Sequence, residues 1–143
     1  LWEPTKEKKN PSTPYSAKFS VPYCVAVGFL RGDAGLNEFN ESSIKDSEIL
    51  ELANKVNYEV DPENEYPKNY TGTLICETED GTFTEHQACF RGGRKQPLTK
   101  NDMNKKYEAN LKFSKISEEE KNNLNVFIDT IFEKPDFSKI LIK

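Results

Sequence analysis

The sequence predicts a small α+β fold: an antiparallel sheet covered by helices, followed by a helical tail. Apolar residues recur at helical spacing in several segments that open with a capping residue. An Asp80-Gly81 pair joins two runs of β-favouring residues, which is a strong signal for a tight hairpin. Because an isolated hairpin is only marginally stable in water, we expect one or two further strands beside it and helices over one face.

Composition limits the classes of function. The chain has 143 residues, the length of one domain, but only 35% are hydrophobic, so we expect its core to be completed by another structure. The net charge of −4 argues against a nucleic-acid partner. No apolar run is long enough to span a bilayer, so no membrane partner is expected either. Three widely spaced cysteines and one histidine argue against a structural zinc site and favour reduced thiols in the cytoplasm.

The most informative stretch runs from residue 15 to residue 32. Ser20 can cap a helix, and Pro22 suits the first turn. Gly32 can end the helix in the left-handed conformation. Nearly every residue between them is apolar, which predicts a helix over residues 21–30 that is buried on most sides. Lys18 then lies just before a helix N-terminus, where backbone N–H groups already favour an anion.

The remaining elements follow in order. Asp46 can cap a second helix, and alternation at residues 58–60 predicts a short strand. The hairpin strands are expected at residues 71–78 and 82–90. Thr99 and Ser117 can each open a further helix through a capping box. The last helix should end near Pro135, before a short amphipathic piece with Phe137, Ile140 and Leu141.

These elements suggest one domain in three parts. Residues 1–14 are charged and contain proline, so they are predicted to be an exposed connector. Residues 15–112 form the α+β core, and residues 113–143 form the helical tail. The apolar stripe of the tail is expected to be partly uncovered or buried by self-association; its members are Leu124, Phe127, Ile128 and Ile131.

The succession Ala17-Lys18-Phe19-Ser20-x-Pro22-Tyr23-x-x-Ala26 is similar to the opening of the second domain of the MmgE/PrpD family, also called the 2-methylcitrate dehydratase family. The hairpin, a glycine-containing loop ending in Pro-Leu, and a capped helix with Lys105-Lys106-Tyr107 continue the resemblance over most of the chain. It implies a C-terminal lid domain whose tail packs on a large N-terminal helical domain, which is expected to lie outside this sequence.

The resemblance also implies a function. The full enzyme would act on di- or tricarboxylic acids, removing or moving a proton alpha to a carboxylate and then eliminating water or losing carbon dioxide. It implies no metal and no organic cofactor. Its implied partners are a small carboxylic acid, the N-terminal helical domain and, for the full-length enzyme, a second copy in a homodimer. Dehydration, decarboxylation and epimerisation stay open, and the chain alone is expected to be inactive.

Lys18 and Tyr23 are the candidate catalytic residues. Lys18 could place a cation against a substrate carboxylate, or it could be a solvated connector lysine. Tyr23 could donate a proton near a developing enolate, or it could be a core residue with a satisfied hydroxyl. By resemblance Tyr23 matches a tyrosine that lines the family's cleft, which would make Val25 a wall of that cleft. Ser20 is either a helix cap alone or a cap that also contacts substrate.

A second candidate site is the loop after the hairpin, with Arg91, Gly92 and Gly93. Glycines let backbone amides approach an anion, and arginine offers a fork that matches a carboxylate. A flexible charged exit from the hairpin is the alternative. The family has a glycine here but does not require so many basic residues, so the resemblance does not assign this loop to the site.

Two other functions remain open. The chain could be a small cytosolic α+β protein-interaction module, with the apolar faces of the last helix and tail as the docking surface. It could also be a family member without catalytic activity.

Overall fold

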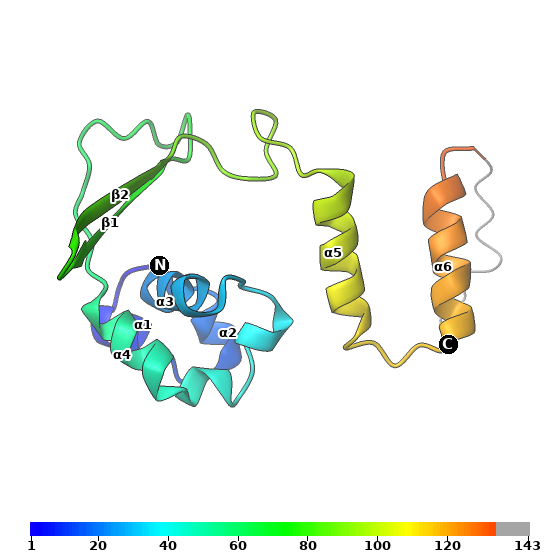
Figure 1. The fold of residues 1–143 in the computed structure, drawn as a ribbon, viewed down its shortest axis with the longest axis horizontal. Coiled ribbons are helices and arrows are strands. Elements are labelled where there is room, and N and C mark those ends of the chain that lie inside the picture. The colour runs from blue at the N-terminus through cyan, green and yellow to red at the C-terminus, as the bar shows by residue number, and fades with distance from the viewer. Residues whose placement is uncertain (134–143) are drawn as a thin grey trace. The chain divides into compact units, whose positions relative to one another are not determined.

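The structure is a computed structural model that describes residues 1–133, so the predicted tail piece at residues 137–141 lies outside the described part. The chain divides into two compact units, Leu1–Met103 and Asn104–Lys143, and each is described by itself. The helices and the antiparallel hairpin confirm the predicted α+β class (Figure 1).

The first unit holds a helical cluster. Its central pair, α3 (Val21–Arg31) and α4 (Ser47–Lys55), packs together, and α1 contacts both helices (Figure 1). Short elements lie before and between them: α1 (Thr5–Lys9), α2 (Pro14–Ala17), η1 (Leu36–Glu38) and η2 (Ser43–Lys45). The buried apolar core of the described residues is small and consists of Ala17, Tyr23, Ala26, Val27, Ile44, Ile49 and Ala53.

The ends of α3 and α4 confirm the predicted caps. The Ser20 side chain accepts a hydrogen bond from the Tyr23 N–H, and Gly32 ends α3 in the left-handed conformation with a φ of 69°. The Asp46 side chain accepts from the Glu48 N–H at the start of α4. These signals are local, and the structure retains all of them.

Burial of α3 differs from the expectation. Its first half is buried, but Phe29 is 62% exposed and Leu30 is also exposed. Helix α3 packs on α4 and α1, and these neighbours cover only part of its apolar surface. The prediction that α3 is buried on most sides was therefore wrong for its last turn.

Residues 1–14 also differ from the predicted connector. They contain α1, which packs against α3 and α4, and they reach the start of α2. Thr13 caps α2, because its side chain accepts from the Ser16 N–H while the Ser16 hydroxyl accepts from the Thr13 N–H. The many charged residues of this segment suggested an exposed connector. The segment nevertheless forms a helix, and α1 packs against α3 and α4.

The hairpin consists of β1 (Gly72–Thr78) and β2 (Gly81–Gln87), which pair antiparallel with Thr78 opposite Gly81. The predicted Asp80-Gly81 turn is confirmed. Residues 58–60 form no strand, which corrects the expected extension of the sheet. Leu74, Ile75 and Phe83 are 42%, 58% and 59% exposed, so the hairpin is not covered as expected. The central helices α3 and α4 turn their apolar faces toward each other instead.

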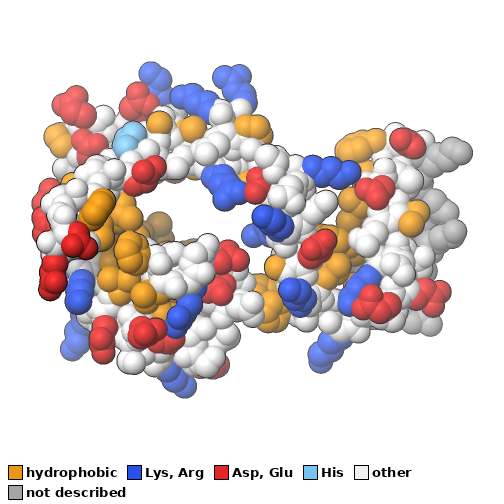
Figure 2. Space-filling view, viewed as in Figure 1, with side chains coloured by type: hydrophobic (Ala, Val, Ile, Leu, Met, Phe, Trp, Pro, Cys, Tyr) orange, Lys and Arg blue, Asp and Glu red, His pale blue; other side chains and the backbone are white. Residues whose placement is uncertain are grey.

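Two longer helices follow, α5 (Lys100–Leu111) and α6 (Glu118–Thr130). Both predicted capping boxes are present: Thr99 exchanges hydrogen bonds with Asp102, and Ser117 with Glu120. Ile128 is 48% exposed, and apolar side chains reach the surface in the view of Figure 2. Among the residues that the structure describes, none of the helices has the length and apolar content needed to cross a membrane.

Candidate functional site

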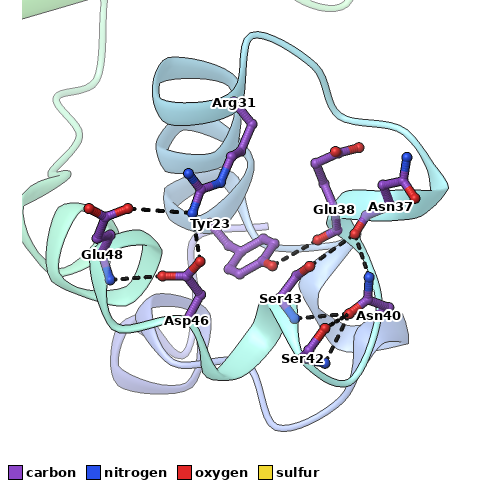
Figure 3. A network of polar contacts seen from close by, with 9 residues as sticks. All are labelled: Tyr23, Arg31, Asn37, Glu38, Asn40, Ser42, Ser43, Asp46 and Glu48. Atoms are coloured by element: carbon purple, nitrogen blue, oxygen red, sulfur yellow. Dashed lines mark hydrogen bonds and ion pairs between the residues drawn. The ribbon is translucent and has the colours of Figure 1, made fainter.

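Tyr23 is fully buried in the first turn of α3. Its hydroxyl donates a hydrogen bond of 2.8 Å to the backbone oxygen of Glu38, in the loop that carries η1 (Figure 3). Its ring packs against Phe39 with the centroids 5.8 Å apart. Burial raises the pKa of Tyr23 to about 12, with smaller contributions from nearby acidic groups. The hydroxyl is therefore a proton donor that is already engaged with the η1 loop.

Ser20 is also buried. Its hydroxyl oxygen accepts from the Tyr23 N–H at 3.1 Å, and its hydroxyl proton is donated to the backbone oxygen of Lys8. A hydroxyl has a single proton to donate, and here the protein uses it. The predicted role of Ser20 as a helix cap is thus confirmed. To donate to a substrate, the Ser20 hydroxyl would have to give up its hydrogen bond to the Lys8 oxygen.

Lys18 is exposed at the C-cap of α2, two residues before Ser20. Its backbone N–H bonds to oxygens at the end of α2. Within residues 1–133 its ammonium group makes no hydrogen bond or ion pair, so it is available to an anion. Val25, the predicted wall residue, is half-buried on α3.

A polar network ties the loop after α3 to the core (Figure 3). Arg31 forms ion pairs of 2.6 Å with Asp46 and 3.4 Å with Glu48. The hydrogen bond from Arg31 is the main cause that lowers the pKa of Asp46. Asn40 accepts from the backbone N–H groups of Ser42 and Ser43 and so orders the turn before η2.

Sequence reasoning missed the ion pairs of this network. The sequence did contain both partners of the main ion pair. Arg31 lies in the last turn of α3, and Asp46 is the acidic residue that caps the start of α4. What the sequence lacked was the pairing of α3 with α4, which brings those ends together.

The loop after β2 is folded on itself. Arg91 forms a 2.6 Å ion pair with Asp102, and the Gly92 N–H donates to the Gln96 oxygen at 2.7 Å. The Gly93 N–H donates to the Phe90 oxygen. Neither glycine amide is therefore free for the predicted anion contact, and one guanidinium nitrogen of Arg91 already pairs with a carboxylate. The glycines serve the loop itself, since Gly92 has a φ of 91° and Gly93 packs against the Phe90 ring.

The structure brings Tyr23 and Ser20 together through a hydrogen bond but joins neither Lys18 nor Arg91 to them by any hydrogen bond or ion pair among residues 1–133. Those residues also contain no group of three or more His, Cys, Asp or Glu side chains placed to hold a metal ion.

Comparison with known proteins decides the family. The family model described as the MmgE/PrpD C-terminal domain matches residues 2–130 of the chain. The chain belongs to the MmgE/PrpD family. All the candidate residues, from Lys18 to Gly93, lie inside the matched range.

Two MmgE/PrpD relatives are named enzymes. Cis-aconitate decarboxylase from Mus musculus is 31% identical over 105 residues, and the human cis-aconitate decarboxylase shows the same identity over the same length. Each match covers 70% of this chain but only 21% of the relative. The chain thus corresponds to about a fifth of the length of these curated relatives.

Proposed function

We propose that this chain is the C-terminal lid domain of an MmgE/PrpD enzyme that acts on a di- or tricarboxylic acid. The match to the MmgE/PrpD C-terminal domain over residues 2–130 carries the proposal. The name cis-aconitate decarboxylase, borne by both relatives, supports a tricarboxylic acid as substrate and loss of carbon dioxide as one reaction. Elimination of water is the other reaction of this class, and the helical N-terminal domain would supply the rest of the cleft.

In this proposal Lys18 holds a carboxylate of the substrate. Loss of carbon dioxide, or removal of a proton alpha to a carboxylate, leaves negative charge on the remaining carbon skeleton. A nearby ammonium group lowers the energy of that charge, most effectively where water is excluded. The exposed Lys18, which has no partner among residues 1–133, supports this role.

Tyr23 has a more demanding role. Its phenol is neutral at working pH, since its pKa is about 12, so it can donate but cannot act as a base. To reach the substrate its hydroxyl must leave the Glu38 oxygen, which requires the η1 loop to move. We propose that substrate binding drives this exchange in the complete enzyme.

The test uses the full-length protein with cis-aconitate as the probe substrate. Lys18→Ala should lower kcat/KM on the order of 100-fold, as expected when one group that stabilises developing charge is removed. Lys55→Ala, which removes another exposed lysine of the same unit, should leave the rate near that of the unaltered enzyme. Equal values of kcat/KM for the two variants would contradict the proposed role of Lys18. Turnover by the isolated chain would contradict the lid assignment.

A second candidate function rests on the exposed hairpin. Leu74, Ile75 and Phe83 leave apolar surface uncovered, as expected for a module that docks another protein. If the full-length protein turns over no acid but Ile75→Lys abolishes a stable complex with a second chain, the module interpretation is favoured.

A further inference from the structure

A pocket of about 120 Å³ lies within the first unit, and none of its residues belongs to the candidate site described above. The rings of Trp2 and Tyr58 stand 4.8 Å apart between centroids, with an interplanar angle of 32°. The chain brings the two sides of the pocket together from its N-terminus and from the end of α4: Trp2, Thr5, Lys9, Val56, Asn57 and Tyr58.

Lys9 is the only basic residue among those that line the pocket. It is half-buried, and its ammonium donates 2.9 Å hydrogen bonds to the Asn54 backbone oxygen and to the Asn57 Oδ1. Both acceptors are neutral, and among residues 1–133 no carboxylate lies within ion-pair distance of this ammonium. An ammonium group has three donors, so one remains for a further acceptor. Both hydrogen bonds of this ammonium are exposed to solvent, so its third donor is open to an anion, with which a charged donor forms its stronger hydrogen bonds.

The charge of the neighbouring Glu3 limits what the pocket can hold. The Glu3 carboxylate accepts from the Thr5 N–H at 2.9 Å and from the Thr5 hydroxyl at 3.0 Å, at the start of α1. The Tyr58 hydroxyl donates to it at 3.4 Å. A ligand with several negative charges would meet this carboxylate as well as Lys9, whereas a ligand with one charge can face Lys9 alone.

We propose that this pocket binds a small monocarboxylate with a short apolar chain. The carboxylate would accept the third ammonium proton of Lys9, and the apolar chain would contact Trp2, Val56 and Tyr58. The volume admits only a few heavy atoms, well below the size of ordinary ligand pockets. This inference is independent of the proposed roles of Lys18 and Tyr23, so either can fail without the other.

The protein contains its own reporter. Trp2 is the single tryptophan of the chain and lines the pocket, so its fluorescence reports directly on the site. The 143-residue chain is titrated with butyrate at constant ionic strength. Butyramide, which has nearly the same shape without the charge, and butylammonium, which has the opposite charge, serve as matched ligands. Butyrate should change the Trp2 emission in a saturable way, with at least tenfold tighter binding than either control ligand.

Two variants test whether the Lys9 ammonium binds the carboxylate of butyrate. Lys9→Gln removes the ammonium and should weaken butyrate binding at least tenfold. Lys6→Gln makes the same change on the exposed side of α1 and should keep the affinity within twofold. Circular dichroism confirms that each variant keeps the helical content of the unaltered chain.

The unaltered chain alone can overturn the proposal if Lys9→Gln fails to fold. Equal binding of butyrate and butyramide would show an apolar pocket without anion selectivity. A change in emission that never saturates would show no site at all. Tighter binding of succinate than of butyrate would contradict the single-charge argument based on Glu3. Amide chemical-shift changes centred outside residues 2–10 and 54–58 would place the ligand elsewhere.

Discussion

The Tyr23 hydroxyl belongs to a fully buried residue of the helical cluster and donates to a backbone oxygen. Its folded pKa of about 12 lies above the value of about 10 expected in an unfolded chain. The unfolded state therefore loses this proton first as the pH rises. The stability that the protonated phenol contributes is fully present below about pH 10 and is lost between there and about pH 12.

We therefore predict that Tyr23→Phe reduces the alkaline loss of stability. At neutral pH this variant should lose about 1 kcal/mol of unfolding free energy, the usual net value of one hydrogen bond. Urea unfolding at pH 7 and at pH 10.5 measures both effects. Tyr15→Phe is the control, since Tyr15 is 71% exposed. If both variants keep the alkaline slope of the unaltered chain, the Tyr23 hydroxyl is not held as described.

Tyr107 presents the opposite case. Its hydroxyl oxygen is buried, yet it has no hydrogen-bond partner among the described residues. A buried polar group without a partner bears the cost of losing its water. We predict that Tyr107→Phe raises the unfolding free energy by about 1 kcal/mol. A lower melting temperature for this variant would show that the hydroxyl has a partner in solution.

Two glycines allow a matched test of their elements. Gly93 lies in the loop after β2, where an added Cβ would stand 2.5 Å from the Phe90 ring. Gly28 lies inside α3, where such a Cβ would meet open space beyond the helix's own backbone. Gly93→Ala should cost about 1–3 kcal/mol through overpacking. Gly28→Ala should instead gain about 0.5–1 kcal/mol, since alanine favours helix.

Thermal unfolding of both variants measures the contrast. Opposite shifts in melting temperature are expected. A neutral Gly93→Ala would mean that the Phe90 ring is free to turn away, and the loop would then lack the packing seen here.

Helix ends and turns were predictable because their causes are local. The caps Ser20, Asp46 and Ser117 and the Asp80-Gly81 turn all act within a few residues, and each is present in the structure. Long-range packing was not predictable. Residues 58–60 alternate as a strand does, but alternation cannot show whether a neighbouring edge is within reach.

The same distinction between local signals and long-range packing applies to the candidate site. The sequence indicated which residues surround the start of α3, but it could not show that Glu38 would take the Tyr23 hydroxyl. That contact depends on the path of the loop between α3 and α4, which no local pattern specifies. Likewise, the glycines after β2 suggested open amides, whereas the loop closes on its own oxygens.

The first unit as a whole combines a packed helical cluster with an exposed hairpin. Regions with few buried apolar contacts open more readily than the core. We predict that amide hydrogens of β1 and β2 exchange faster than those in the buried half of α3. Hydrogen exchange followed by mass spectrometry measures this difference. If the amide of Thr84 is protected as strongly as that of Ala26, something covers the hairpin in solution.

The Ser20 hydroxyl shows how far an end of this chain can act. It caps the first turn of α3 by accepting from the Tyr23 N–H. It also donates a hydrogen bond to the backbone oxygen of Lys8, which lies in α1. Shortening the polypeptide past residue 8 would remove that acceptor together with most of α1, which packs against α3 and α4. Anyone trimming the leading residues for expression would therefore remove a contact of Ser20, the residue that caps the helical turn holding Tyr23.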